Sequence, residues 1–268
     1  MTNIILNNYV PLGLKEKIMI NLFSFKLFFY SRKKRSYDII NSEYDLGGWS
    51  KEIDHFNIES RAINLNADSK IITNYNDMLV KCDLDSFEKS YNLMLVKLLS
   101  HYIEDSIVEM GCGLGVNLFL LHKAGFKNLK GYDLSKNAIK RAKQHSEKKS
   151  MSIDFGVHDL NQPFTENMIN NKVVFTHQCL EQLTLFMPNI LKNLVNGRPK
   201  IVINFEVDYH SSSSKVKRYM DFQGYQNNLV SELKKLENQN KIEILSIIKL
   251  PLSYNTFNTP SMIIWKLK

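Results

Sequence analysis

The sequence is poor in cysteine and has no apolar run long enough to cross a bilayer. It contains three cysteines in 268 residues, Cys82, Cys112 and Cys179, and no two of them form a CxxC pair. Such wide spacing argues against a disulfide framework and against a structural zinc site. We therefore expect a cytoplasmic protein without a metal. Its hydrophobic content of 44% and charged content of 23% are ordinary for a globular domain.

The sequence also lacks a general basic excess, although its net charge is +8. Seven Lys and Arg residues against one Glu give residues 1–35 a charge of +6, so the other 233 residues carry only +2. A nucleic-acid-binding groove needs a concentration of positive charge along the binding surface. We therefore do not expect a nucleic-acid partner.

The basic segment, residues 15–35, combines apolar and positively charged residues. A transmembrane helix needs about 20 consecutive apolar residues, and Asn21, Ser24 and Lys26 interrupt this run. A secretory signal carries its charges before the apolar run, whereas here the densest charges follow it. Two interpretations remain open. The segment is an amphipathic helix that either packs on the main domain of the protein or lies on an anionic membrane surface, at the inner face of the membrane.

Apolar β-rich runs and helical patterns alternate from residue 86 onward, as is typical of a parallel sheet with crossover helices. The last two β-rich runs, at 241–250 and 261–268, are joined by a loop and predict neighbouring strands near the sheet edge. We predict a Rossmann-like α/β domain over residues 86–268, with a mostly parallel sheet and an antiparallel C-terminal edge strand. Residues 1–85 are predicted to form a helical, lid-like region.

A glycine-rich turn, "VEMGCGLG", separates the first predicted strand from a helix. Free N–H groups at a helix N-terminus suit a nucleotide-like ligand. However, Val116 replaces the third glycine of the dinucleotide fingerprint, and no Lys-Ser or Lys-Thr pair follows as in a P-loop. Glu109, just before the glycines, would repel a phosphate and attract a cation. The turn therefore favours a cationic ligand without a phosphate.

Two acids follow the next two predicted strands. Asp133, in "GYDLS", is placed to accept hydrogen bonds from ribose hydroxyls, and Asp159, in "VHDL", is placed to accept one from an adenine amino group. With the glycine turn, these segments resemble the first three motifs of class I S-adenosylmethionine-dependent methyltransferases. The resemblance implies S-adenosyl-L-methionine as cofactor and S-adenosyl-L-homocysteine as product. It also implies a set of cofactor-binding residues: Glu109, Gly111, Cys112, Gly113, Gly115, Asp133, Leu134, His158, Asp159, Leu160 and His177.

The segment "VVFTHQCLEQL" resembles the family segment after the fourth strand, with Gln182 in place of the usual His. His177 lies at the predicted strand end, where the family places the methyl group. It can be a general base, a substrate contact or a wall of the cofactor pocket. A base is needed chiefly when the acceptor is a hydroxyl, and His177 and His210 are the candidates with a suitable intrinsic pKa.

The C-terminal part resembles methyltransferases of bacterial surface-polysaccharide gene sets, in "INFEV" and "NTFNTPSMIIWKLK". It implies methyl transfer to a sugar hydroxyl, to a capsule or lipopolysaccharide modification, or to a nucleotide-linked precursor. N-methylation of a small metabolite, methylation of protein or RNA, and a non-catalytic cofactor-binding role are the alternatives, and the sequence indicates no oligomeric state. The candidate substrate contacts are Tyr37, Tyr44, Trp49, Gln178, Glu206 and Tyr209.

Overall fold

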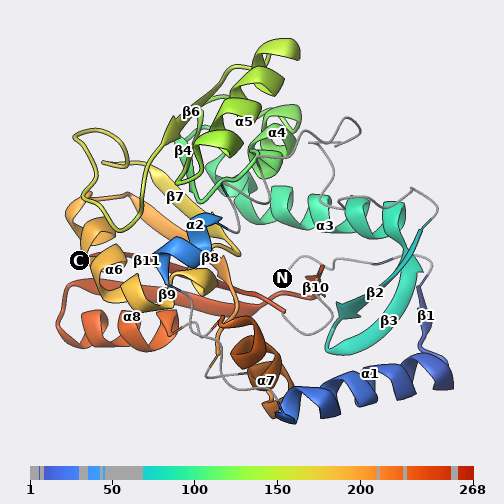
Figure 1. Cartoon of the computed structure of the whole chain (residues 1–268). Coiled ribbons are helices and arrows are strands. Elements are labelled where there is room, and N and C mark those ends of the chain that lie inside the picture. The colour runs from blue at the N-terminus through green and yellow to red at the C-terminus, as the bar shows by residue number, and fades with distance from the viewer. Residues whose placement is uncertain are drawn as a thin grey trace.

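A seven-stranded sheet forms the centre of the molecule (Figure 1). The computed structural model describes residues 6, 9–29, 36–42, 45, 69–209, 212–225, 228–254 and 259–268. The strand order is β6-β5-β4-β7-β8-β11-β9. The strands are β4 (Ile107–Met110), β5 (Leu129–Asp133), β6 (Ile153–Val157), β7 (Val173–His177), β8 (Ile201–Glu206), β9 (Ile242–Lys249) and β11 (Ser261–Leu267).

The pairing confirms the predicted fold, because β6, β5, β4, β7 and β8 are parallel and β11 is antiparallel to both of its neighbours. β11 lies one place inside the sheet, between β8 and the edge strand β9. A buried polar contact fixes it there. Asn204 on β8 donates to the Thr176 hydroxyl at 2.9 Å and accepts a hydrogen bond from the Trp265 indole, also at 2.9 Å. Trp265 is fully buried.

Helices cover both faces of the sheet. Successive residues of a strand point to opposite faces, and on β4 Ile107 belongs to one apolar cluster and Val108 to the other. α3 (Leu84–Leu99), α4 (Val116–Lys123) and α5 (Lys136–Lys148) contribute to the first cluster, and α6 (Met187–Asn196) and α8 (Leu229–Asn238) to the second. This three-layer arrangement leaves the carboxyl ends of the parallel strands open for a site.

A second sheet corrects the prediction of a helical N-terminal region. Its order is β1-β3-β2-β10, with β1 (Tyr9–Pro11), β2 (Lys70–Tyr75), β3 (Met78–Asp83) and β10 (Leu252–Ser253). β2 and β3 form a hairpin whose two turn residues, Asn76 and Asp77, have φ of 49° and 66°, as a type I′ turn requires. The alternating pattern of "KIITNY" and "MLVKCD" around Asn-Asp is the signal for this hairpin. The sheet also joins the N-terminal region to residues 252–253.

Among the described residues, three helices lie outside the three-layer core. α1 (Leu14–Lys26) continues into a short 3-10 turn at Leu27–Phe29 and runs along one margin of the molecule, with α7 (Ser214–Gln223) near one of its ends (Figure 1). α2 (Tyr37–Asn41) begins at Ser36, whose hydroxyl accepts a hydrogen bond from the Ile39 N–H. No helix in the described ranges is long and apolar enough to cross a membrane.

Candidate functional site

The glycine turn lies at the carboxyl end of β4 and is fastened to the neighbouring strand β5. The N–H groups of Gly111 and Cys112 both donate to the carbonyl oxygen of Tyr132, at 2.7 and 3.0 Å. The Cys112 side chain is buried, and burial raises the pKa of its thiol well above the usual range. Cys112 therefore shapes the turn from inside, and only its backbone faces a possible ligand.

The glycines of the turn are required by the backbone and by protein neighbours. Gly111, Gly113 and Gly115 have φ of 74°, 52° and 81°, in the left-handed region that favours glycine. A Cβ at Gly111 would lie 2.5 Å from the Cys179 sulfur, and one at Gly115 would lie 2.7 Å from the Phe155 ring. At these two positions the close approach is thus made by the protein itself, a cause that the sequence pattern did not reveal.

Glu109 lies at the end of β4 with its side chain almost wholly buried. Its Oε1 accepts a hydrogen bond from the Asn117 amide at 2.5 Å, in the first turn of α4. A buried carboxylate is costly unless positive charge or hydrogen bonds compensate it. Its position beside the glycine turn suits the ammonium group of an amino-acid ligand.

Asp133 braces the same turn from the end of β5. Its Oδ2 accepts a hydrogen bond from the Gly113 N–H at 2.7 Å, and its Oδ1 accepts one from the Ser135 N–H at 2.8 Å. Burial raises the pKa of this carboxyl, the negative charge of Asp45 adds to the rise, and the two N–H groups oppose it. Each carboxylate oxygen has a second lone pair, so Asp133 can hold the turn and still accept hydrogen bonds from ribose hydroxyls.

The predicted adenine contacts follow β6. Asp159 accepts a hydrogen bond from the Asn161 N–H at 2.9 Å, which fixes the turn after the strand. The His158 ring stacks on Phe164 with ring centroids 4.9 Å apart, and burial lowers its pKa. Its Nε2 is buried and has no hydrogen-bond partner within the described ranges. The Leu160 side chain is buried in the apolar cluster that also contains Val108 and Val174, so Leu160 can offer a ligand only its backbone.

Asp45 is a site residue that the sequence motifs did not indicate. Its Oδ1 accepts hydrogen bonds from the Ser135 hydroxyl at 2.5 Å and from the Asn137 N–H at 3.0 Å. These two residues begin α5, directly after Asp133 and the half-buried Leu134. The N-terminal region therefore reaches the cofactor side of the sheet. No motif surrounds Asp45, and the contact joins residues about 90 positions apart, so local sequence gave no signal.

His177, at the end of β7, pairs with a tyrosine from α3. The Tyr91 hydroxyl lies 2.7 Å from His177 Nε2, and Tyr91 itself is almost wholly buried. The two rings meet edge to face, with centroids 6.0 Å apart. The ring of Phe205, on the neighbouring strand β8, has its centroid 6.1 Å from that of His177. Tyr254, after β10, packs on Tyr91 at 5.0 Å. The sequence predicts His177 as a site residue but not Tyr91, because the pattern around Tyr91 is that of an ordinary core residue of a helix.

The loop after β7 is held by Glu206, at the end of β8. Glu206 is fully buried and its Oε1 accepts a hydrogen bond from the Cys179 N–H at 3.1 Å. Burial raises the pKa of this carboxyl to about 7, although nearby hydrogen-bond donors in residues 176–181 partly oppose the rise. Gln178 adopts φ of 52°, and its buried amide nitrogen has no hydrogen-bond partner in the described part of the chain. Gln178 is thus placed to meet a ligand, whereas Glu206 is placed to hold the loop.

The remaining predicted substrate contacts are only partly described. The Tyr209 hydroxyl donates to both carboxylate oxygens of Asp221 on α7, at 3.2 Å each, and Lys217 lies 5.8 Å from its ring centroid. Tyr209 therefore ties α7 to the chain after β8. Tyr37 begins α2, and its side chain lies outside the described atoms. Tyr44, Trp49 and the candidate base His210 lie outside the described residues.

About one third of the chain matches a known protein family. Residues 107–196, which contain the glycine turn, Asp133, Asp159 and His177, match the family model described as a methyltransferase domain. Such a domain uses S-adenosylmethionine, and the buried Glu109 and the doubly bound Asp133 fit its ammonium and ribose groups. A search of curated proteins found no match.

Solved structures share the fold at low sequence identity. A magnesium protoporphyrin IX methyltransferase from Synechocystis PCC 6803, with bound S-adenosylhomocysteine, is 13% identical with a TM-score of 0.60, over 87% of this chain and 100% of that one. The (4+2)-cyclase SpnF is 10% identical with a TM-score of 0.61, over 88% and 98%. A geranyl diphosphate C-methyltransferase from Streptomyces coelicolor A3(2) is 12% identical with a TM-score of 0.52, over 69% and 81%. At these identities the likeness establishes the fold and leaves the acceptor open.

Proposed function

We propose that this class I S-adenosylmethionine-dependent methyltransferase methylates a hydroxyl group of a small polar acceptor, with His177 as the general base. The observation that carries the proposal is the 2.7 Å contact between His177 Nε2 and the Tyr91 hydroxyl at the end of β7. A hydroxyl must lose its proton as it attacks, so its methylation benefits from a positioned base. An imidazole with a fixed ring orientation supplies one near neutral pH.

The cofactor half of the site positions the electrophile. S-adenosylmethionine supplies a methyl group on a positively charged sulfur. In this proposal Glu109 binds its amino group, Asp133 its ribose and Asp159 its adenine. Holding both reactants in line replaces a bimolecular encounter with an effectively unimolecular step, which is the main source of acceleration in such a reaction.

The base function requires one tautomer of His177. If Nε2 carries the proton and donates it to the Tyr91 oxygen, Nδ1 is the nitrogen that accepts the proton of the acceptor hydroxyl. Tyr91 is then a positioning residue that holds the ring and stabilises the imidazolium formed after proton transfer. Its burial in the aromatic group with Tyr254 and Phe87 keeps the hydroxyl at a fixed place.

The acceptor class follows from the sequence resemblance rather than from a described cavity. We propose a hydroxyl of a sugar, of a capsule or lipopolysaccharide modification, or of a nucleotide-linked precursor. An amine acceptor is the second candidate, because an amine with a low pKa needs no base. The third candidate is a domain that binds the cofactor without methylating, and its support is that the same fold occurs in SpnF, a protein named as a cyclase.

Two measurements separate these functions. Calorimetry with S-adenosylhomocysteine tests the cofactor site, and tritiated methyl transfer to a panel of sugars, nucleotide sugars and amines tests the acceptor. With a hydroxyl acceptor, we expect His177→Gln to lower kcat by 100-fold or more and to leave cofactor affinity within about threefold. Tyr91→Phe should lower kcat less and shift the pH profile of kcat. Tight cofactor binding without turnover on any acceptor would favour the third class, and full activity of His177→Gln would refute the role of His177.

A further inference from the structure

Helix α1 turns its more apolar side away from the protein. The inward-facing residues are Glu16, Ile20, Ser24 and Leu27, of which Ser24 and Leu27 are buried and Glu16 forms an ion pair with Lys81 at 3.3 Å. The large exposed apolar side chains of α1 and the turn after it are Leu14, Ile18, Met19, Leu22, Phe23, Phe25 and Phe29. An amphipathic helix that only packs on its own domain shows the opposite arrangement.

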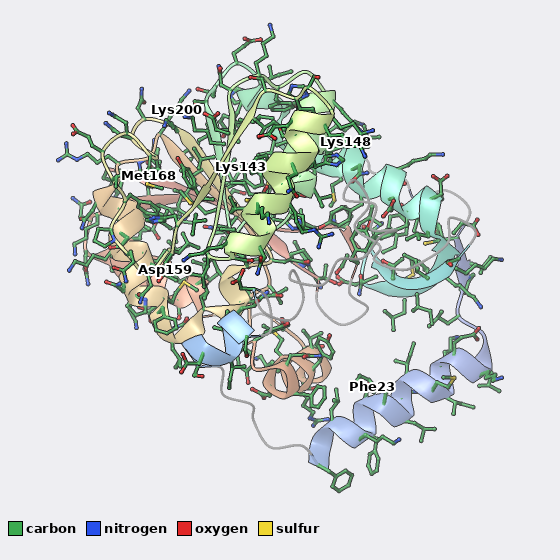
Figure 2. All side chains as sticks on the ribbon, turned by 45° about the horizontal axis from the view of Figure 1, so that its top comes forward. Phe23, Lys143, Lys148, Asp159, Met168 and Lys200 are labelled. Carbon is green, nitrogen blue, oxygen red and sulfur yellow. The ribbon has the colours of Figure 1, made fainter. Side chains whose placement is uncertain are left out.

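Four of the exposed residues form one stripe. At about 100° per residue, Leu14, Ile18, Leu22 and Phe25 fall within about 80° of arc, and their exposed fractions are 76%, 48%, 56% and 59%. Phe29 extends the stripe beyond the helix, because its ring meets that of Phe25 edge to face at 5.4 Å. Figure 2 shows α1 and its side chains along the margin of the molecule. The stripe is therefore a continuous apolar surface.

Positive charge flanks the stripe on both sides. On the same helical wheel the exposed Lys15 and Lys26 lie on one side of the stripe and the exposed Lys17 lies on the other. The single acid of α1, Glu16, faces inward and is paired with Lys81. The sequence then continues with Arg32, Lys33, Lys34 and Arg35. An apolar stripe edged by lysines is complementary to a surface with an apolar interior and negative headgroups.

We propose that α1 lies flat on an anionic lipid surface, with its apolar stripe at the boundary between headgroups and acyl chains and its lysines at the lipid phosphates. The 13-residue helix is too short to span a bilayer. The flanking lysines and the basic run that follows, residues 32–35, favour an anionic lipid surface over a protein partner, because clusters of Lys and Arg beside an amphipathic helix are typical of binding to anionic lipids. This inference is independent of the proposed function, since α1 contributes no residue to the catalytic or cofactor site.

The test is sedimentation of the full chain with vesicles of phosphatidylcholine alone, or mixed with phosphatidylglycerol at about 3:1. We expect binding to the mixed vesicles that weakens as salt rises, and little binding to phosphatidylcholine. Replacing Lys15, Lys17 and Lys26 by Gln should weaken binding roughly 100-fold. Each lysine at the anionic surface contributes about 1 kcal/mol, and about 1.4 kcal/mol corresponds to a tenfold change in affinity. Leu22→Asp with Phe25→Asp should weaken it at least as much, because both side chains leave the lipid.

The matched control is Leu93→Asp on α3, where the side chain is half exposed but lies far from α1 in the sequence and outside the stripe. It should bind vesicles as the parent protein does. All variants should retain the parent affinity for S-adenosylhomocysteine, which shows that they are folded. Absence of binding to anionic vesicles, equal binding to neutral vesicles, or equal loss in Leu93→Asp would overturn the proposal. Dimerisation that the Leu22 and Phe25 changes abolish, without vesicle binding, would assign the stripe to a second copy of the chain.

Discussion

Replacing Gly111 by Ala should destabilise the protein through two effects that the structure separates. The residue has φ of 74°, and a left-handed conformation costs an L-residue about 1–2 kcal/mol. The new Cβ would also lie 2.5 Å from the Cys179 sulfur and 2.6 Å from its Cβ, so one of the two segments must move. Overpacking of this kind costs about 1–3 kcal/mol. The expected total loss in the free energy of unfolding is therefore about 2–5 kcal/mol.

Gly125→Ala is the matched control for the conformational part. Its φ is 98°, and the nearest atom to its added Cβ is 4.0 Å away, so only the backbone strain applies. Urea unfolding measures the free energy of unfolding of both variants. We expect Gly111→Ala to lose about 1–3 kcal/mol more than Gly125→Ala. Cys179→Gly removes the atoms that the new Cβ would overlap. In the Cys179→Gly background, Gly111→Ala should therefore cost only the backbone part of the free energy of unfolding, and the packing part should be recovered. Equal losses in Gly111→Ala and Gly125→Ala, or no recovery in the double variant, would refute the packing explanation of the glycine.

Three further predictions concern the acids around the site. Asp133→Asn should weaken S-adenosylhomocysteine binding about 10- to 100-fold in calorimetry, because the charged acceptor of ribose hydrogen bonds is lost; unchanged affinity would remove Asp133 from the cofactor site. Asp45→Ala should lower the free energy of unfolding by about 0.5–2 kcal/mol in urea, through loss of the hydrogen bonds to the start of α5, with Asp38→Ala on α2 as an exposed control. The pKa of Glu206 is raised from 4.5 to about 7 in the folded protein, so the folded state binds the proton more tightly and stability falls as pH rises from about 4.5 to 7, by about 3 kcal/mol. Glu206→Gln should remove that part of the pH dependence, and an unchanged slope would contradict the raised pKa.

The residues proposed for the cofactor could be identified from the sequence because they are close together along the chain. Glu109, the three glycines and Asp133 fall within 25 consecutive residues, and each follows from a local need: a strand end, a left-handed turn or the next strand end. The parallel sheet then brings these ends to one edge. The fold class followed for the same reason, since alternating strands and helices allow few topologies.

The parts that the sequence did not predict depend on contacts between distant segments. Asp45 meets Ser135, and Tyr91 meets His177, across 90 and 86 positions, and neither pair has a local pattern. The β2–β3 hairpin was missed for another reason. Its Asn76-Asp77 turn and its alternating residues are visible in the sequence, but each strand has only six residues and the neighbouring runs favour helix, so the helical pattern outweighs the shorter β signal.

Apart from Asp45, which lies beside Ser135 at the start of α5, the same division separates the residues proposed for the two halves of the reaction. The residues placed for the cofactor lie at the ends of β4, β5 and β6, inside the segment that matches the methyltransferase domain. The partner of the proposed base comes instead from α3, which precedes that segment, and Tyr254, which packs on it, follows β10 near the end of the chain. Because β10 pairs with β2, the second sheet joins the two flanking segments on the side of His177. We therefore expect acceptor specificity to change with α3, the second sheet and the chain around Tyr254, while cofactor affinity follows the glycine turn and Asp133.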